Sequence, residues 1–171
     1  MLFDSTLLFW HTGNVYNFTA GEFVSLAGQT TSASTAINLG NARDLGIGPG
    51  EELPMVEVLF GTAVTVGGTA GQQVNIQFQG STNSTLWTTY IETGYQNTAS
   101  FAAGSGWRFD VPRRPPGAAL PLYYQLNVVT QGLGTASVTP ISTGTILAGI
   151  VIGTAESAGT LDQYAAGYSV A

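Results

Sequence analysis

The strongest constraint on the fold is a strict alternation of polar and apolar residues in the segment QVNIQFQ at positions 73–79. In an extended chain, Val74, Ile76 and Phe78 fall on one face, and the glutamines and the asparagine fall on the other. On a helix the same residues would be scattered around the whole circumference. The segment is therefore predicted to be a β-strand with one apolar face.

Similar runs rich in β-branched and aromatic residues predict strands along the rest of the chain. These runs cover residues 22–26, 55–60, 86–91, 107–111, 122–129 and 146–152. Turn-forming residues separate them, for example the glycine pair at 67–68 and the Pro-Pro-Gly at 115–117. About eight strands in a chain of this length indicate an all-β sandwich in a single domain, residues 1–171.

Helical signals are weak, because the 23 glycines are spread through the chain and no long window has apolar residues at helical spacing. We expect at most a short helical turn, at residues 41–46 or within 153–167. The uncharged stretch at 139–155 is interrupted by threonines and glycines, so it is predicted to be a buried strand and not a membrane span. The first ten residues carry Asp4 and no cation, which is not the pattern of a secretory signal.

Both ends of the chain carry more apolar bulk than a solvated terminus needs. We expect residues 1–20 to form an N-terminal arm or edge strand, and residues 153–171 to form a C-terminal arm. Each arm has two open interpretations: it closes the core of its own chain, or it crosses to a neighbouring subunit. The candidate assembly residues in the arms are Phe9, Trp10, Tyr16, Phe18, Tyr164 and Tyr168.

Charge is unusually scarce. Charged residues make up 8% of the chain, against about 25% in an ordinary soluble domain, and there are four arginines and no lysine. Neutral polar side chains lose less entropy than lysine or glutamate when they are held still, so such a surface suits permanent contact. The net charge of −6 argues against nucleic acid or an anionic membrane as a partner. Arg43 and Asp44 are expected to pair within their own turn, with pairing between subunits as the alternative.

Catalytic, cofactor and metal sites are not predicted. His11 is the one histidine and has no nucleophile-elbow pattern near it, and the absence of cysteine excludes thiolate chemistry and disulfides. The glycine-rich segment 46–50 is followed by two glutamates, which would repel a phosphate. Glu92 and Asp110 are the carboxylates that a glycoside hydrolase would need to bring together.

The segment AINLGNARDLGIG at residues 36–48 resembles the small capsid cement, or decoration, proteins of tailed bacteriophages. The similarity continues through residues 74–86, 115–129 and 146–152, and more weakly through 164–170. The sequence departs from the pattern of those proteins in two ways that concern the contact residues. The region 21–34 is longer than in them, and the segment 123–126 lacks the arginines that we associate with this strand of the family.

The resemblance implies a jelly-roll subunit without enzyme activity or cofactor. It implies homotrimers on the outer surface of the virion, assembled in the host cytoplasm, at the three-fold and quasi-three-fold positions of the icosahedral shell. There each trimer would bridge neighbouring capsomers of the major capsid protein.

Three other functions stay open. The first is a jelly-roll carbohydrate-binding module that uses Trp10, Trp87, Trp107 or the tyrosines as stacking platforms, although the alternation around Trp107 favours a core position. The second is a self-assembling coat protein, which often has a basic arm, whereas no arginine precedes Arg43 here. The third is the carboxylate hydrolase described above.

Overall fold

The computed structural model describes residues 8–9, 16–17, 24–26, 29–42, 45, 54–66, 72–132 and 141–151. The strands in these residues are β1 Tyr16–Asn17, β2 Val24–Leu26, β3 Gln29–Ala33, β4 Ile37–Asn38, β5 Met55–Val66, β6 Gln72–Ser81, β7 Thr88–Glu92, β8 Gln96–Asn97, β9 Gly106–Asp110, β10 Tyr123–Gly132 and β11 Ile141–Val151. One short 3₁₀ turn, η3 Thr98–Phe101, is the only helical element in the described part of the chain. The prediction of an all-β protein is confirmed.

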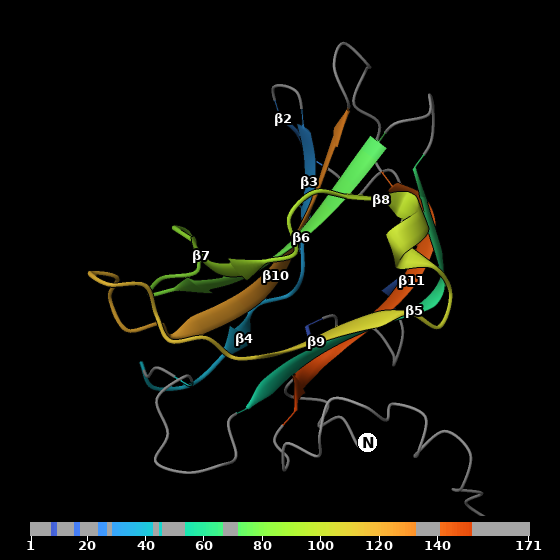
Figure 1. Ribbon diagram of the computed structural model, residues 1–171. Helices are drawn as coiled ribbons and strands as arrows, with labels where there is room; N and C mark the ends of the chain where they lie inside the picture. The colour runs from blue at the N-terminus through green and yellow to red at the C-terminus, as the bar shows by residue number, and fades with distance from the viewer. Residues whose placement is uncertain are drawn as a thin grey trace, which may run out of the picture.

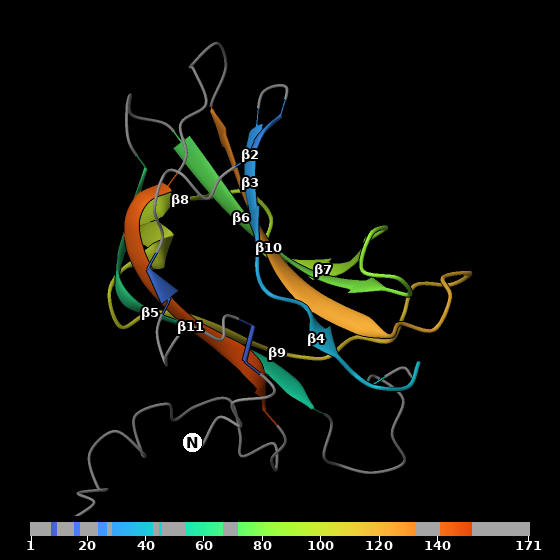
Figure 2. The ribbon, with the colours of Figure 1, turned by 180° about the vertical axis from the view of Figure 1, so that it is seen from behind.

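The strands form two antiparallel sheets, shown from opposite sides in Figures 1 and 2. The first sheet has the order β1-β11-β5-β9. The second has the order β2-β3-β10-β6-β7, with β4 added to the edge of β10 and β8 to the edge of β6. Apolar residues of both sheets share one core, so the sheets face each other as a sandwich.

All seven runs that the sequence marked as strands contain strands in the structure. The alternating segment lies in the middle of β6, where Val74, Ile76 and Phe78 enter the core as predicted. The strands that extend furthest beyond their sequence signals are β5, which continues through Gly61 to Val66, and β11, which already begins at Ile141. The two strands pair with each other along most of this length, and register shifts near Thr145 take up the irregularity.

The structure corrects three details of the sequence-based prediction. Strand β3 was not predicted, because its sequence QTTSA has no apolar face, and it forms by pairing with β10. The run 86–91 begins as a strand only at Thr88, which leaves Leu86 on a loop. A helical turn that was not predicted lies at η3, where buried Phe101 packs edge-to-face against Phe60. Residues 43, 44 and 46 of the turn expected at 41–46 lie outside the described residues.

An aromatic cluster at the centre of the core joins the two sheets. Phe78 of β6 and Tyr124 of β10 lie at diagonal positions of neighbouring strands, since Phe78 pairs with Leu126 and Tyr124 with Gly80, and their rings are stacked with centroids 4.8 Å apart. The edge of Phe78 also meets Phe9, Tyr90 and Phe109 at 6.0 to 6.2 Å. Phe109 comes from β9 of the opposite sheet, so the Phe78 ring connects the two sheets directly.

One glycine of β6 is required by this cluster. A Cβ atom on Gly80 would lie 2.7 Å from the Tyr90 ring. That distance is far shorter than van der Waals contact, so any side chain here would displace Tyr90 from Phe78 and Tyr124. The close approach explains why a glycine interrupts a strand in which it otherwise weakens the backbone.

We predict that Phe78→Ala lowers the free energy of unfolding by about 3–5 kcal/mol, because the fully buried ring would leave a cavity between the sheets. Urea denaturation monitored by circular dichroism measures the change. Leu86→Ala, at a position that is 76% exposed, is the control and should change stability by less than about 0.5 kcal/mol. Equal effects of the two substitutions would contradict the role assigned to the cluster.

Candidate interaction surfaces

Of the eight candidate assembly residues, the structure describes Phe9 and the backbone of Tyr16. Trp10, Phe18, Arg43, Asp44, Tyr164 and Tyr168 lie outside the described residues. The proposed C-terminal arm, 153–171, and the expected helical turn at 153–167 lie outside them as well.

The N-terminal segment pairs with the edge of β11. Leu8 forms a bridge with Gly149, the backbone N–H of Phe9 donates to Ala148 at 3.0 Å, and Tyr16 pairs with Ile146. The Phe9 side chain is fully buried beside Phe78. At Phe9, therefore, the arm packs as an edge segment against the core of its own chain, which was the first of the two interpretations left open.

The outward face of the second sheet is a continuous layer of hydrogen-bonded polar side chains, which we call the amide face. It consists of Asn75, Gln77 and Gln79 of β6, Thr89 and Glu92 of β7, and Gln125 and Asn127 of β10. Asn75, Gln77 and Gln79 alternate along β6 with residues that enter the core, and the other four pair opposite Gln77 or Gln79, so all seven lie on the side of the sheet away from the core. Asn75, Gln79 and Gln125 are nevertheless buried, at 1%, 8% and 6% exposure, whereas Glu92 is exposed.

The hydrogen bonds of the amide face run across three strands. Gln125 Nε2 donates to Gln79 Oε1 at 2.8 Å, and Gln79 Nε2 donates to Gln77 Oε1 and to Thr89 Oγ1, both at 3.1 Å. Asn127 Nδ2 also donates to Gln77 Oε1 at 3.1 Å. Each amide is thereby held in one orientation before any partner arrives.

The network ends at a single carboxylate. Oε2 of Glu92 accepts from Asn75 Nδ2 at 2.9 Å and from Gln77 Nε2 at 3.1 Å. Thr93 Oγ1 donates to Asn75 Oδ1 at 3.2 Å, which completes the partners of an amide that is 1% exposed. Glu92 therefore serves as the hydrogen-bond acceptor on which the buried part of the layer depends.

The outward face of the first sheet is also neutral where β5 pairs with the first half of β11. Thr145 Oγ1 donates to Thr62 Oγ1 at 3.1 Å, and the hydroxyls of Thr65 and Ser142 lie 3.2 Å apart. The hydroxyl of Thr65 is also hydrogen-bonded to that of Thr143. In this part of the first sheet, therefore, hydroxyls hydrogen-bond one another where an ordinary surface would carry charges.

One carboxylate of the first sheet is buried. Glu57 of β5 is 1% exposed, and its Oε2 has no hydrogen-bond partner among the residues that the structure describes. Burial raises the pKa of this carboxyl above its ordinary value, and the positive charge of Arg108, opposite it on β9, partly offsets the rise. The charged form of Glu57 is therefore less favourable in the folded protein than in the unfolded chain.

Two adjoining loops at one end of the second sheet, residues 82–87 and 112–122, form what we call the loop tip. In Figure 1 both loops lie at the left, beyond β7. The backbone N–H of Leu122 donates to the carbonyl oxygen of Ser81 at 2.8 Å, which joins the bases of the two loops. Leu86 and Leu120 are 76% and 43% exposed here, and they are the exposed large apolar side chains of the described residues.

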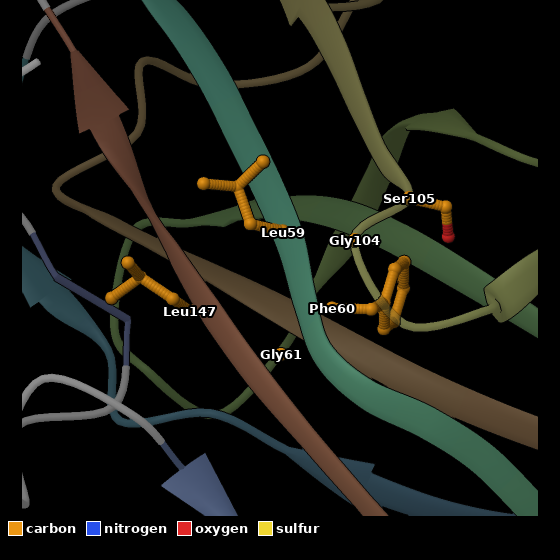
Figure 3. Close-up of a pocket in the computed structure, with 6 residues that line it drawn as sticks. All are labelled: Leu59, Phe60, Gly61, Gly104, Ser105 and Leu147. Carbon is orange, nitrogen blue, oxygen red and sulfur yellow. The ribbon is translucent and has the colours of Figure 1, made fainter. Parts of the chain in front are cut away.

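A shallow cavity of about 320 Å³ lies beside β5 and β11. It is lined by Leu59, Phe60, Gly61, Gly104, Ser105 and Leu147, and Figure 3 shows that Leu59 and Leu147 reach it from neighbouring strands. Ser105 is the only lining residue with a polar side chain, and its hydroxyl already donates to the Ala102 carbonyl oxygen at 2.7 Å. The cavity therefore offers apolar contact but no group for acid–base or nucleophilic chemistry.

The residues suggested for a hydrolase or a sugar platform do not meet in one site. Glu92 projects from the outer face of one sheet, and Asp110, paired opposite Met55, projects from the outer face of the other. Trp107 packs against the core, edge-to-face with Phe60 and Phe101, as its alternation predicted. Trp87 lies on the loop tip, and Trp10 is outside the described residues.

Within the described ranges, no three histidine, cysteine or carboxylate side chains gather in a group that could hold a metal ion. No helix in the same ranges is long and apolar enough to cross a membrane. No protein-family model matches the sequence, and no curated protein matches it significantly.

The amide face and the loop tip were not predicted as sites. The amide face has a signal in the sequence, because polar residues occupy every second position of β6 and recur at Gln125 and Asn127. The loop tip has a weaker signal, a single leucine after the polar run GSTNST, in a segment that was predicted to be a strand.

We predict that Glu92→Ala lowers the free energy of unfolding by about 1–3 kcal/mol, because Asn75 Nδ2 would remain buried without its acceptor. Asp110→Ala removes an exposed carboxylate from the opposite sheet and should cost less than about 0.5 kcal/mol. Urea denaturation of both variants measures the difference. A Glu92 variant as stable as the Asp110 variant would contradict the role of Glu92.

We predict that Glu57→Gln makes the protein more resistant to urea at pH 7. Because the pKa of Glu57 is raised on folding, the neutral carboxyl is favoured in the folded protein. Its contribution to the free energy of unfolding is fully present below the ordinary pKa of 4.5 and is lost as the pH rises through the folded-state pKa. The advantage of the glutamine variant should therefore disappear when the pH is lowered below 4.5. Denaturation midpoints at pH 4 and pH 7 test this, and a glutamine variant that is weaker at pH 7 would mean that the Arg108 pairing outweighs burial.

Proposed function

We propose that this chain is a jelly-roll capsid cement protein that trimerises and bridges neighbouring capsomers of the major capsid protein on the outside of a phage head. The resemblance of residues 36–48 to cement proteins of tailed phages motivates the assignment. The strand order and the chemistry of the outer surface support it, each for a separate physical reason.

The strand pairing supports the jelly-roll part of the proposal. β1 pairs with β11, β3 with β10, β5 with β9, and β6 with β7, so the pairs are nested within one another along the chain. A jelly roll is such a nested set of pairs wrapped around a core, with each pair divided between two sheets in turn. Here the pairs alternate between the sheets, and the contacts β11–β5 and β10–β6 join them into the observed orders.

The observation that carries the assembly part of the proposal is the scarcity of charge in the sequence together with the hydrogen-bonded amides of the amide face. Side chains that are already held in one orientation lose little entropy when a partner covers them. Few ions have to be stripped of water at such a contact. A trimer that grips the shell at three equivalent points also gains avidity, so each contact can be modest.

The decisive experiment is a cryo-electron microscopy map of particles from the virus that encodes this chain. The proposal expects density for trimers of the chain on the outside of the shell, around its three-fold and quasi-three-fold positions. Particles from which the gene has been deleted provide the matched control and should lack this density. A complete shell without the chain on it would overturn the proposal.

We predict that the purified chain is a trimer at micromolar concentration. The reason is that a sandwich with so few charges and several exposed strand edges is protected from nonspecific association when copies cover one another. Light scattering coupled to size exclusion measures the mass. A stable monomer would count against the trimer without deciding the location of the chain, which the particle map addresses.

One observation favours a second candidate, binding of a neutral glycan. Gln77, Asn127 and Glu92 of the amide face are at least partly exposed, and their amides and carboxylate are groups that hydrogen-bond sugar hydroxyls. A glycan array probed with the purified protein separates the candidates. Specific binding that is lost in Glu92→Ala but retained in Asp110→Ala would favour the glycan-binding function.

A further inference from the structure

We propose that the loop tip is the surface through which the protein docks onto the outer face of the capsid shell. Leu86 and Leu120 would act as apolar anchors, and Arg113 would face an acidic area of the coat protein. The inference rests on the proposed cement function and adds the contact surface that this function requires.

The first argument is exposure. A single exposed leucine is unremarkable in a folded protein, because much of any protein surface is apolar. Here, however, the two exposed large apolar side chains of the described residues lie on two loops that are joined at their bases. The cavity lined by Leu59, Phe60 and Leu147 is a second apolar surface, but both of its leucines are half-buried, so the large apolar side chains that are fully available to a partner are those of the loop tip.

The second argument is preorganisation of the Leu86 loop. Asn83 Oδ1 accepts from the backbone N–H groups of Thr85 and Leu86, both at 3.0 Å, and from Ser81 Oγ at 3.2 Å. Ser84 has a φ of 58°, a conformation that non-glycine residues seldom adopt, and its hydroxyl donates to the Asn83 carbonyl oxygen at 2.6 Å. The loop thus holds an apolar side chain in solvent in one fixed arrangement, which reduces the entropy lost on docking.

The second loop, residues 112–122, is also held by hydrogen bonds within the loop. Arg114 Nη1 donates to the Ala118 carbonyl oxygen, and the Ala118 N–H donates to Pro115 at 3.1 Å. Gly117 supplies the positive φ of 82° that the turn requires. Leu120 lies two residues after Ala118, so both anchors are carried by loops with internal hydrogen bonds.

Charge identifies the occupant as an acidic protein surface. The chain as a whole has a net charge of −6, yet residues 82–87 and 112–122 contain two of its four arginines and no acidic residue. Arg113 is exposed, whereas Arg114 bonds to its own loop. A partner with acidic side chains around an apolar depression complements this arrangement.

The position of the loop tip favours the shell over a second copy as the occupant. β1, the blue arrow beside β11, is the end strand of the first sheet, and the loop tip lies on the other side of the sandwich in both views (Figures 1 and 2). A subunit can therefore use its edges to meet other subunits while its loop tip remains free for the shell.

The test is an add-back titration of purified protein onto particles from which its gene has been deleted, with occupancy measured by quantitative gel or cryo-electron microscopy. We expect Leu86→Ser to weaken attachment about tenfold or more, because burial of one leucine corresponds to at least that factor. The double variant with Leu120→Ser should bind below detection. Leu86→Met keeps the apolar bulk and should attach normally, as should Ala99→Ser, an exposed position on η3 away from the loop tip.

Each outcome of this titration decides something. If the wild-type protein and both serine variants attach equally, the loop tip is not the docking surface, although the cement function stands. If the serine variants lose the wild-type oligomeric state in light scattering, the loop tip is an interface between copies and the shell assignment is wrong. If the wild-type protein itself does not attach to the particles, the cement function fails, and the inference fails with it.

Discussion

The aromatic contact between Phe78 and its neighbours is the interaction on which the rest of the structure depends. Its ring is stacked on Tyr124 in the same sheet and meets Phe109 from the opposite sheet. Phe9 of the N-terminal segment closes the same cluster from the edge of β11. Without cysteine or a described metal site, the sandwich relies on such packing to fix the relative position of its sheets. The same packing also positions the amide face and the loop tip. β6 and β10 carry core residues on one side and the amide face on the other, and the loop tip lies at one end of their sheet.

A surface of ordered neutral side chains has different physical consequences from an ordinary charged one. Lysine and glutamate keep molecules apart and resist being immobilised, whereas the amides of β6 and β10 are already immobilised by one another. The convergence of two amides on Glu92 shows how this chain places a charge on an outer face: the carboxylate holds the orientation of its neighbours. Glu57 is the opposite case, since its carboxylate is buried and its pKa is raised by that burial.

Much of the fold could be predicted from the sequence, because most strands have an apolar face that the core requires. The alternation from Val74 to Phe78 specified β6, its inward side chains and its outward polar row. Strand β3 could not be predicted, since Gln-Thr-Thr-Ser-Ala has no such pattern and the strand exists through hydrogen bonds to β10. The loop tip was missed for a related reason. Leu86 was interpreted by its apolar character, whereas its exposure is set by the side chain of Asn83, whose bonds turn the chain before β7 begins.

The loop that carries Leu86 has features that folding does not require but that contact with a partner does. Folding is favoured when apolar side chains are buried and when backbone dihedral angles are unstrained. At Ser84 and Leu86 neither condition holds. A positive φ at a serine is unfavourable, and a largely exposed leucine gains nothing from the hydrophobic effect in the isolated chain. The hydrogen bonds of Asn83 nevertheless stabilise both features together. An exposed leucine on a backbone of unfavourable φ is expected where a surface has to be complementary to a partner and not to its own core. This is the physical reason for assigning the docking contact to these loops.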